Sequence, residues 1–402
     1  MRIVHLVAHL GGGVGKAHSA LCGVDGGDVR RHYLLLEQPR DRRYVDAVLA
    51  AGAEVTVAPT PGEVRALIAA ADILQVEWWN HPKLYEALVR WDLPASCTVF
   101  WSHVSGLHAP FIPPALVSAP ERFLFTSPCS LAGRDVSGLS DEARQRIGVV
   151  NSGFGFGSSA RPSLRRAGRV GYLGTVDFSK LSRDFFAVVE RAQLAEPVSL
   201  WGGIDPGSEV LSHSSQAVRF EGHAADPEAV LRQTGIFIYL LQPEHFGTAE
   251  NALVEAMSLG CVPLVFDNPA ERAIVEHGRT GFVEASVEAA AERLRWMLAN
   301  PGEVMTMGVA AAEAMAATRS PRQSAQQLAA IYREVIDLPK RQIDYAALLG
   351  ATPALWYLSS QGGWAMDASP VGPARKGTLA HFAQSFPGDA SFTALKNKAA
   401  VA

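Results

Sequence analysis

A loop between an apolar run, residues 236–241, and a helical pattern, residues 252–259, holds the residues that most clearly suggest chemistry. Backbone N–H groups around Gly247 and Thr248 can receive the phosphates of a ligand, because the start of a helix has free N–H groups and favours negative charge. Glu255 lies seven residues past Thr248, two turns along the same helix face. A carboxylate there can accept hydrogen bonds from a ribose diol, and the alternative is a solvated glutamate at the helix edge. The loop predicts a nucleoside diphosphate site.

Lys180 is a second candidate, because it lies between a predicted strand, residues 170–174, and a helical pattern, residues 182–194. In open parallel sheets, ligands bind in the loops outside the carboxyl ends of the strands. A lysine in such a loop can neutralise the charge of a leaving diphosphate. Its spacing alone also fits an ordinary solvated lysine.

Residues 11–16 form a glycine-rich loop, Gly-Gly-Gly-Val-Gly-Lys, after the first predicted strand. A Walker loop requires Gly and Ser or Thr where Leu10 and Ala17 stand. A dinucleotide fingerprint that begins at Gly11 requires a glycine where Lys16 stands. Two interpretations remain: small residues that let backbone N–H groups approach an anion, or a tight turn that needs glycine.

Short apolar runs alternate with helical patterns along most of the chain, which is typical of parallel α/β layers. The predicted strands are residues 3–8, 32–37, 54–58, 73–77, 98–103, 123–126, 170–174, 198–202, 217–221, 236–241 and 262–266. Residues 155–168 are rich in Gly, Ser, Pro and Arg and mark the predicted linker. We expect two doubly wound domains, residues 1–158 and 168–337, the second with a helix from residue 303 to about 336. Residues 338–402 are expected to add one more helix and a loosely ordered tail.

Length, composition and charge narrow the class of protein. The chain has 402 residues, which is more than the ~250–300 at which a single core stops growing. The net charge of −4 gives no general basic field for binding nucleic acid. No run reaches the ~18 apolar residues of a membrane-spanning helix, so only peripheral membrane contact is compatible with the sequence. Four widely spaced cysteines predict reduced thiols in a cytoplasmic protein.

The residues around Glu255 belong to a longer pattern: Glu244-His-Phe-Gly, then Glu255-Ala-Met-Ser-Leu-Gly, then Asn268-Pro-Ala-Glu and Thr280-Gly-Phe. This pattern resembles the retaining glycosyltransferases of family 4, and the resemblance covers roughly residues 1–335. The family has the α/β GT-B fold, in which two Rossmann-like doubly wound domains face each other across a cleft. The resemblance implies this fold and the transfer of a sugar from a nucleoside diphosphate sugar to an acceptor hydroxyl, with the anomeric configuration retained.

The resemblance also implies roles for residues of the second domain. Glu255 is similar to the acidic residue that binds the donor ribose, and Lys180 to the lysine that binds the diphosphate, although the arginine that usually precedes it is missing. The family has two glutamates eight positions apart, and Gly247 stands eight positions before Glu255. Either Glu244 or Glu250, which we weight equally, contacts the donor sugar in its place, or backbone groups do.

In the first domain, His103 ends a predicted strand where the family commonly has a histidine near the reacting sugar. The alternative is a core histidine with its hydrogen bonds satisfied. Trp79, Asn80 and His81 follow the strand 73–77 and are expected at the acceptor, because aromatic faces suit sugar rings. Adjacent tryptophans also suit the edge of a core.

The expected site is therefore divided between the two domains. Catalytic roles are expected for Lys180, His103 and Glu244; donor binding for Gly12, Gly13, Gly174, Lys180, Gly247, Thr248, Ala249, Glu250 and Glu255; and acceptor binding for Trp79, Asn80 and His81. The sequence has no clear metal-ligand pattern, and the family stabilises the leaving diphosphate without a metal, so no cofactor is expected beyond the nucleotide sugar. Two alternatives remain: an epimerase or phosphorylase with the same fold, or a non-catalytic protein that binds nucleotides or sugars.

Overall fold

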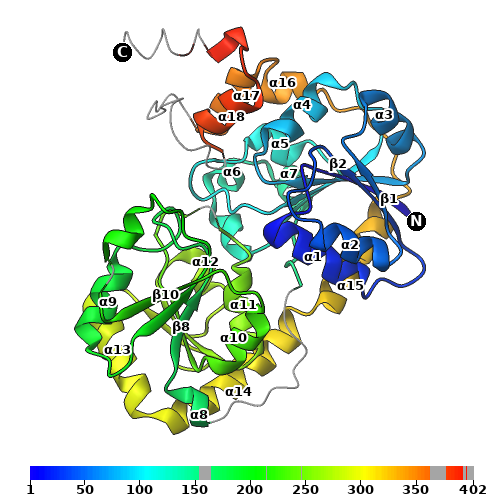
Figure 1. Cartoon of the computed structure of the whole chain (residues 1–402). Helices are drawn as coiled ribbons and strands as arrows, with labels where there is room; N and C mark the ends of the chain where they lie inside the picture. Colours follow the sequence, from blue (N-terminus) through cyan, green and yellow to red (C-terminus); the bar gives the residue numbers. More distant parts are fainter. Residues whose placement is uncertain (154–163, 214, 246, 363–376, 393–394, 396–402) are drawn as a thin grey trace. The chain divides into compact units, whose positions relative to one another are not determined.

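Figure 1 presents a computed structural model of the chain, which describes residues 1–153, 164–213, 215–245, 247–362, 377–392 and 395. Most of the predicted linker, residues 155–163, lies outside the described residues, as do residues 363–376 and 396–402 of the predicted tail. The chain forms two compact units. The first holds residues 1–153 and the chain from residue 321 onward, and the second holds most of the residues between.

A sheet of seven parallel strands forms the centre of the first unit. The strands are β1 (Arg2–Val7), β2 (Arg30–Leu35), β3 (Glu54–Val57), β4 (Ile73–Trp78), β5 (Cys97–Ser102), β6 (Arg122–Phe125) and β7 (Ile147–Val149). Their order is β3-β2-β1-β4-β5-β6-β7, so the direction of strand addition reverses between β1 and β4. Open α/β sheets bind ligands beyond the carboxyl ends of the strands at this point of reversal.

Side chains of the central strands pack into two cores, one on each face of the sheet. The helical elements of this unit are α1 (Gly12–Cys22), α2 (Arg43–Ala50), α3 (Pro61–Ala69), α4 (Pro82–Arg90), α5 (Pro114–Ser118), η1 (Pro128–Ala132), α6 (Arg134–Ser137), α7 (Asp141–Gln145) and α15 (Pro321–Val335). Leu74 and Val76 of β4 enter one core, and Ile73 enters the other. All six positions of β4 are buried, as in central parallel strands. Gln75 and Glu77 are polar nonetheless, and by alternation they share the face of Ile73.

The helix predicted from residue 303 to about 336 is two helices, α14 (Pro301–Thr318) and α15. The helix is interrupted before Pro321, because proline has no N–H to donate and its ring clashes with the preceding turn. Leu328 and Tyr332 of α15 are fully buried in a core of the first unit, together with residues of its sheet. The second domain therefore ends earlier than the predicted residue 337.

The end of the chain carries three short helices, α16 (Tyr345–Leu349), α17 (Pro353–Ser359) and α18 (Leu379–Ser385), and each contacts α4. The ring of Tyr85 on α4 lies 6.2 Å from that of Trp356 and 5.5 Å from that of Phe382, measured between centroids. Both Trp356 and Phe382 are fully buried. The one further helix expected after residue 338 is two short helices, α16 and α17. The prediction of a loosely ordered tail is wrong for α18, because a segment this short shows no helical period and is held by a few large rings.

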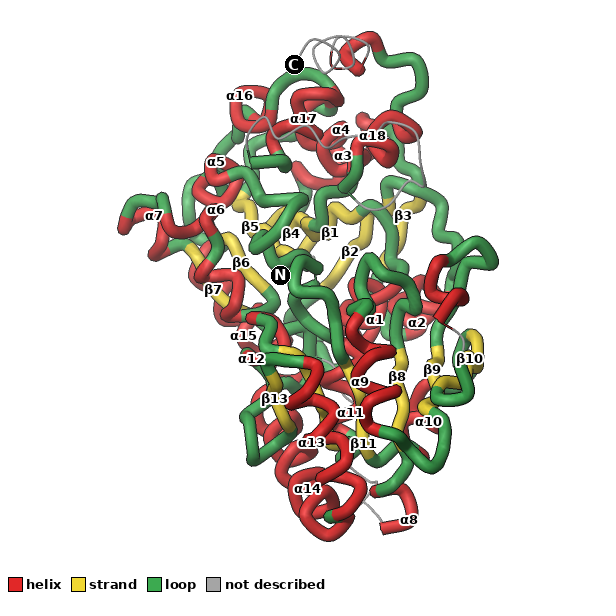
Figure 2. The backbone as a smooth tube through the Cα atoms, turned by 90° about the vertical axis from the view of Figure 1, so that its left-hand side faces the viewer, coloured by secondary structure: helices red, strands yellow, loops and turns green. Residues whose placement is uncertain are grey.

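The second unit contains a sheet of six parallel strands. The strands are β8 (Val170–Leu173), β9 (Val198–Trp201), β10 (Val218–Gly222), β11 (Ile236–Tyr239), β12 (Val262–Phe266) and β13 (Phe282–Glu284), visible as yellow segments in Figure 2. The order is β10-β9-β8-β11-β12-β13, so the reversal lies between β8 and β11. The remaining helical elements are α8 (Leu164–Ala167), α9 (Asp184–Ala192), η2 (Glu209–His213), α10 (Pro227–Gln233), α11 (Asn251–Ser258), α12 (Pro269–Arg272) and α13 (Val287–Ala299). The prediction of two doubly wound domains is confirmed.

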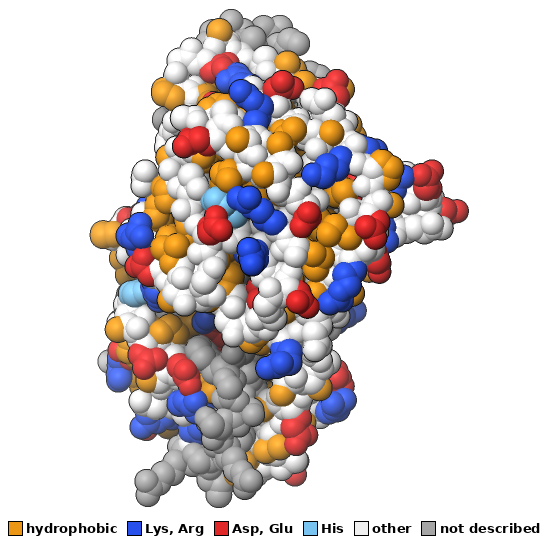
Figure 3. All heavy atoms as spheres, turned by 90° about the vertical axis from the view of Figure 1, so that its right-hand side faces the viewer, with side chains coloured by type: hydrophobic (Ala, Val, Ile, Leu, Met, Phe, Trp, Pro, Cys, Tyr) orange, Lys and Arg blue, Asp and Glu red, His pale blue; other side chains and the backbone are white. Residues whose placement is uncertain are grey.

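Acidic and basic side chains are interspersed on the face of the protein in Figure 3. This mixture follows from a composition of 36 Lys and Arg against 40 Asp and Glu. Among the residues that the structure describes, no helix is both long enough and apolar enough to span a bilayer.

Candidate functional site

Lys180 lies beside the end of β11, at the point where the strand order of the second unit reverses. Two backbone hydrogen bonds hold it there: Gln242 N–H donates to the Lys180 carbonyl at 2.8 Å, and Ser182 N–H donates to the Leu240 carbonyl at 3.0 Å. These two hydrogen bonds connect the loop after β8 to the segment that follows β11. This places a lysine where a parallel sheet binds ligands, as the sequence predicted.

Glu250 is the ionic partner of Lys180. Its Oε2 lies 3.1 Å from the Lys180 Nζ and accepts a hydrogen bond of 2.7 Å from the hydroxyl of Tyr239, the last residue of β11. Burial opposes ionisation of Glu250, yet Lys180 and His245 together with the Tyr239 hydrogen bond bring the pKa of this carboxyl below its usual range. Lys180 also lies over the Tyr239 ring, 5.3 Å from its centroid. We call Lys180, Tyr239 and Glu250 the lysine cluster.

The backbone of Glu250 explains how the carboxylate turns inward. Glu250 precedes α11 as its N-cap and has φ 39° and ψ 56°, in the left-handed region. A residue with a Cβ at such a position costs about 1–3 kcal/mol, so surrounding contacts must stabilise it. The ion pair with Lys180 and the hydrogen bond from Tyr239 are those contacts.

His245 connects the lysine cluster to a second buried carboxylate. Its Nδ1 lies 3.6 Å from Glu250 Oε1, and its Nε2 lies 3.3 Å from Glu271 Oε1. Asn268 donates a hydrogen bond of 3.2 Å to the same oxygen of Glu271. Burial lowers the pKa of His245, but the hydrogen bond and charge of Glu271 and the charge of Glu250 outweigh it and raise the pKa above its usual value. His245 therefore keeps its second proton to a higher pH than an ordinary histidine, because the raised pKa favours the cationic ring beside the two carboxylates.

Sequence reasoning assigned no role to Tyr239, His245 or Glu271. Tyr239 is the last residue of an apolar strand and gives no signal of its own. His245 and Glu271 both stand within the longer pattern around Glu255, and that was the available signal. Charged residues inside an otherwise apolar βαβ segment are expensive to bury unless they are paired.

The structure separates the two glutamates that the sequence left as equals. Glu244 is exposed, whereas Glu250 is 3% exposed and bound to Lys180. The described contacts therefore favour Glu250 over Glu244 as the carboxylate of this site. Glu255 lies on α11 and is 4% exposed, so the alternative of a solvated glutamate at the helix edge is wrong.

The predicted glycines lie in loops at the starts of helices or the ends of strands. Gly247, Thr248 and Ala249 belong to the loop between β11 and α11. Gly174 follows β8, and a Cβ there would lie 2.8 Å from the Tyr172 hydroxyl, which donates to the Thr175 carbonyl.

In the first unit, Gly12 is the first residue of α1 and Gly13 the second. Gly12 has φ 57°, a left-handed conformation that favours glycine, so the tight turn accounts for it. Gly11 N–H donates to His9 Nδ1 at 3.0 Å. The structure thus gives the glycine-rich loop a conformational role, and an anion site there stays a prediction.

Asn80 differs from its two neighbours in the predicted acceptor set. It is fully buried with φ 59°, its Nδ2 donates to the Phe111 carbonyl at 3.2 Å, and its Oδ1 accepts from the Tyr85 hydroxyl at 2.9 Å. These bonds make Asn80 a residue of the turn, with its amide turned away from solvent. Trp79 and His81 lie with ring centroids 6.1 Å apart at the carboxyl edge of the sheet.

The end of the chain reaches the same edge. The ring of His381 on α18 lies 5.0 Å from that of His81, and the ring of His9 lies 5.9 Å from His81 and 5.2 Å from Trp79. His381 was not singled out in the sequence, because it stands in a segment without a sustained pattern. The structure places its ring beside that of His81, one of the residues predicted at the acceptor.

Within the described residues, one group of His and Glu at this edge has the spacing of a metal site: His9, Glu37 and His81. However, the Nδ1 atoms of His9 and His81 accept hydrogen bonds from backbone N–H groups, at 3.0 Å and 3.3 Å. A neutral histidine with Nδ1 as acceptor carries its proton on Nε2, and metal-binding histidines instead donate from their second nitrogen. The contacts fit hydrogen bonding better than a metal.

His103 follows β5 at the carboxyl edge of the first sheet, and its ring lies 6.3 Å from that of Trp79. Its Nε2 lies 2.8 Å from Glu77 Oε2. Glu77 was not predicted as a functional residue, because in the sequence it is only a charged residue inside a strand.

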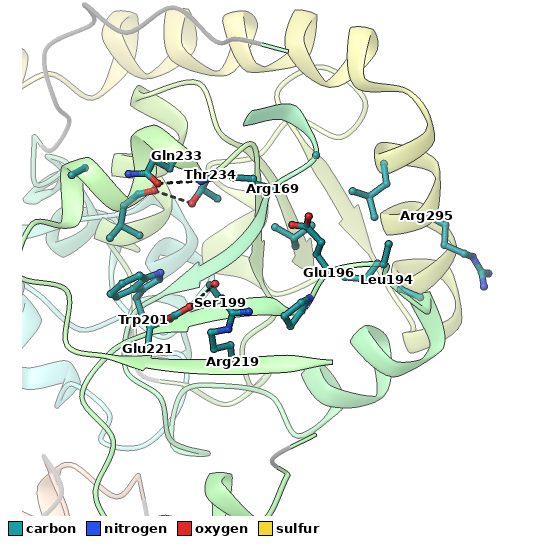
Figure 4. A pocket seen from close by; sticks show the side chains of 18 of the residues that line it. Arg169, Leu194, Glu196, Ser199, Trp201, Arg219, Glu221, Gln233, Thr234 and Arg295 are labelled. Atoms are coloured by element: carbon teal, nitrogen blue, oxygen red, sulfur yellow. Dashed lines mark hydrogen bonds and ion pairs between the residues drawn. The ribbon is translucent and has the colours of Figure 1, made fainter. Parts of the chain in front are cut away.

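A separate cavity of about 1460 Å³ lies in the second unit, at the starts of β8 and β9 and along α10, as Figure 4 shows. Ser199, Trp201, Arg219 and Glu221 line its sheet side. Ser199 donates to Glu221 at 2.9 Å, and Arg219 lies 3.8 Å from the same carboxylate. The cavity shares no residue with the lysine cluster.

Residues 212–315 match the family described as glycosyl transferases group 1. The matched segment contains Glu250, His245, Glu255 and Glu271. No curated protein matches the chain in sequence.

Solved glycosyltransferase structures have a similar fold. HepE from Anabaena, in complex with UDP and glucose, has a TM-score of 0.62 and 16% identity, with 83% of this chain and 100% of that chain covered. A glycosyltransferase from Rickettsia africae has a TM-score of 0.64 and 13% identity, covering 84% and 99%. Sucrose-phosphate synthase from Thermosynechococcus elongatus has a TM-score of 0.61 and 14% identity, covering 83% and 99%. With its two parallel-sheet domains in series, the chain has the GT-B fold.

Proposed function

We propose that this protein is a glycosyltransferase that moves a hexosyl group from a nucleoside diphosphate sugar to a hydroxyl acceptor, with retention of configuration and without a bound metal. The observation that supports it most is the lysine cluster, which lies at the reversal point of a sheet in the second unit. Residues 212–315 of the chain, which include Tyr239 and Glu250 of the cluster, match glycosyl transferases group 1. A uridine nucleotide is the first donor to test, because HepE was solved with UDP and glucose.

Lys180 is the residue proposed to stabilise the leaving diphosphate. Its side chain is 26% exposed, so the ammonium can meet a ligand while one of its protons stays with Glu250. Negative charge grows on the diphosphate as the glycosidic bond breaks, and a fixed ammonium stabilises that charge most in the transition state. The start of α11 adds free N–H groups beside it.

Glu250 is proposed to hold Lys180 in place, and Glu255 to bind the donor ribose. Glu250 already accepts hydrogen bonds from Tyr239 and Lys180 on one oxygen and faces His245 with the other. A carboxylate committed in this way orients the ammonium instead of contacting the sugar. Glu255, buried on α11, is the acidic group assigned to the ribose.

The acceptor is proposed to lie against Trp79 and His81 of the first unit, with His381 of α18 beside them. Aromatic and imidazole rings offer flat faces for the C–H groups of a sugar and N–H donors for its hydroxyls. A cytoplasmic location is proposed as well, because the four cysteines are free and buried.

The test is a thermal-shift screen of the purified chain against UDP, GDP, ADP and TDP, followed by turnover with the matching nucleotide sugar. A ligand at 100 times its Kd stabilises the folded state by ~2.7 kcal/mol, which is easily detected. The anomeric configuration of the product, read by NMR, tests retention, and activity in the presence of a chelator tests metal independence. Absence of any nucleotide shift contradicts the proposal, and sugar release or rearrangement without acceptor transfer indicates a phosphorylase or an epimerase.

A further inference from the structure

One face of the second sheet is partly accessible, although parallel strands are usually buried on both faces. In β9, Val198 and Leu200 are buried on one face, whereas Ser199 and Trp201, which alternate with them, are only half-buried on the other. Ser199 and Trp201 line the cavity of about 1460 Å³, and residues of α10 line it as well, as Figure 4 shows. The cavity therefore lies against the face of the sheet.

A β-bulge beside Trp201 brings a carboxylate to this face. In the pairing of β9 with β10, Leu200 is opposite Phe220 but Trp201 is opposite Gly222, so Glu221 is the extra residue. Bulges bend a strand and re-aim its side chains. Gly222 has φ 75°, which favours glycine, and a Cβ there would meet no atom within 4 Å. The strand thus leaves open space opposite the indole.

Four side chains with different hydrogen-bonding capacities meet there. Ser199 Oγ donates to Glu221 Oε1 at 2.9 Å, and Arg219 Nη1 lies 3.8 Å from the same oxygen. Among the residues that the structure describes, the Trp201 indole N–H and the second oxygen of Glu221 make no hydrogen bond. We call Ser199, Trp201, Arg219 and Glu221 the cavity floor. It provides one carboxylate oxygen as acceptor, and an indole N–H and a guanidinium as donors.

The charges of the cavity lining balance. Three arginines and three carboxylates line it: Arg169, Arg219, Arg295, Glu196, Glu221 and Asp226. A lining without net charge gives no general attraction for an anion. The carboxylate of Glu221 in the floor also repels a phosphate group directly. An uncharged ligand with several hydroxyl groups fits this lining better than a nucleotide does.

We propose that this cavity is a second ligand site of the protein and that it binds an uncharged oligosaccharide. Trp201 offers a flat apolar face to the C–H groups of a sugar ring, while Glu221 accepts hydrogen bonds from its hydroxyls and Arg219 donates to them. The cavity is larger than the ~300–1,000 Å³ of a pocket for a drug-sized ligand, so it has room for more than one ring. It shares no residue with the lysine cluster, and the inference does not depend on the proposed sugar transfer.

Two-dimensional NMR of the tryptophan indole N–H groups tests the site in the wild-type protein. The Trp201 signal is assigned by its absence from the Trp201→Phe spectrum, and the probes are maltotetraose, cellotetraose and mannotetraose at millimolar concentration. At least one probe is expected to shift the Trp201 signal. The signal of Trp296, which is exposed on α13 outside the cavity, is expected to stay unchanged. No shift of the Trp201 signal with any of the three overturns the inference.

Substitutions then test whether the cavity floor holds the saccharide. Trp201→Ala and Glu221→Gln are each expected to raise the Kd for the same oligosaccharide about tenfold, which is the weakening expected from losing one hydrogen bond to a charged group. Trp296→Ala and Glu209→Gln are the matched controls, because both residues lie in the same unit, are exposed and do not line the cavity. An unchanged Kd in folded Trp201→Ala, or equal losses in the controls, overturns the inference. If Trp201→Ala does not fold, Glu221→Gln decides.

The remaining outcomes identify other occupants. A Trp201 signal that moves with protein concentration in the absence of saccharide indicates a second copy of the chain and overturns the inference. A Trp201 signal that UDP shifts and the saccharides do not indicates a nucleotide site and overturns it as well. Saccharide binding without any thermal shift by nucleotides supports the cavity and contradicts the proposed function, whereas nucleotide binding at the lysine cluster without saccharide binding contradicts the cavity site only.

Discussion

Each unit of this protein has a buried glutamate near the carboxyl edge of its sheet, and the two carboxylates contact different kinds of side chain. Glu250 in the second unit holds an ammonium, that of Lys180, at 3.1 Å. Glu77 in the first unit holds three imidazoles, those of His5, His18 and His103. Both carboxylates are ionised, because in each case their partners outweigh the effect of burial on the pKa.

The partners determine what each carboxylate can contribute. Lysine keeps its charge over the whole physiological range, so the lysine cluster provides a fixed positive charge where a diphosphate is proposed to bind. Histidine can be neutral, and a neutral ring has one donor and one acceptor nitrogen. The network around Glu77 therefore holds three rings in place, and the lysine cluster holds an ammonium group in place.

The largest expected effect tests the role of the Lys180 ammonium group. Lys180→Ala is expected to lower kcat by ~10²–10³-fold, because it removes a group that stabilises developing charge. Turnover under saturating donor is the measurement, and Arg191→Ala, which breaks an exposed ion pair with Glu288 in the same unit, is the control. Near-normal single-turnover rates in Lys180→Ala would remove the lysine from the mechanism.

Only substitutions in the second unit are expected to change the affinity for the nucleotide. Glu255→Ala is expected to weaken binding of the nucleoside diphosphate ~10–100-fold, the equivalent of one or two hydrogen bonds to a charged group. Isothermal calorimetry measures it, with His5→Asn of the first unit as the comparison. An unchanged Kd for Glu255→Ala would exclude the ribose role.

Glu250→Gln asks whether this carboxylate holds Lys180 or the donor sugar. If it orients the ammonium, binding of the nucleoside diphosphate and of the nucleotide sugar should weaken by the same factor, about tenfold. Loss of affinity for the nucleotide sugar only, with the diphosphate unaffected, would instead place Glu250 on the sugar. The ratio of the two Kd values is the measurement.

The smallest expected effect is on the free energy of unfolding. The contribution of one buried histidine in each unit should depend on pH, and the two dependences should have opposite signs. The pKa of His245 is raised, so its contribution to the free energy of unfolding is fully present below about pH 6.5 and is lost as pH rises through the folded value. The pKa of His5 is lowered to about 3, so its contribution is present above about pH 6.5 and is lost as pH falls.

Denaturant unfolding of wild type, His245→Gln and His5→Asn between pH 5 and 8 measures both contributions. The difference from wild type in the free energy of unfolding is expected to shrink toward high pH for His245→Gln and toward low pH for His5→Asn, by about 1.4 kcal/mol for each unit of pKa difference. Parallel pH dependences in all three proteins would contradict the assigned charge states.

Local pattern predicted the elements well where the pattern was long. The strand predicted at 73–77 is Ile73–Trp78, and the helical pattern at 252–259 is α11, Asn251–Ser258. The order of strands and helices then gave two doubly wound domains. The short helix α18 was missed, because it is held by contacts of Phe382 with α4 rather than by its own periodicity.

The candidate site was predicted in part for the same reason. Lys180 and Glu255 could be singled out as candidates because each stands at a definite place in a strand–loop–helix unit. Glu77 was missed because a charged residue inside a strand carries no sign of its partners. Glu244 and Glu250 were left as equals, since they lie at the two ends of one loop with five residues between them, and only the fold decides which one turns inward.

The sequence by itself determined that this chain makes two parallel α/β layers and where along each layer a ligand loop falls, because periodicity and turn residues are local properties. Only the tertiary structure decided which charged groups meet. His5 and Glu77 are 72 residues apart in the chain and lie 2.8 Å apart in space. Lys180 and Glu250 are as distant in sequence and form an ion pair. Neither contact has a local signal, because a parallel sheet brings together the ends of strands that long crossovers separate.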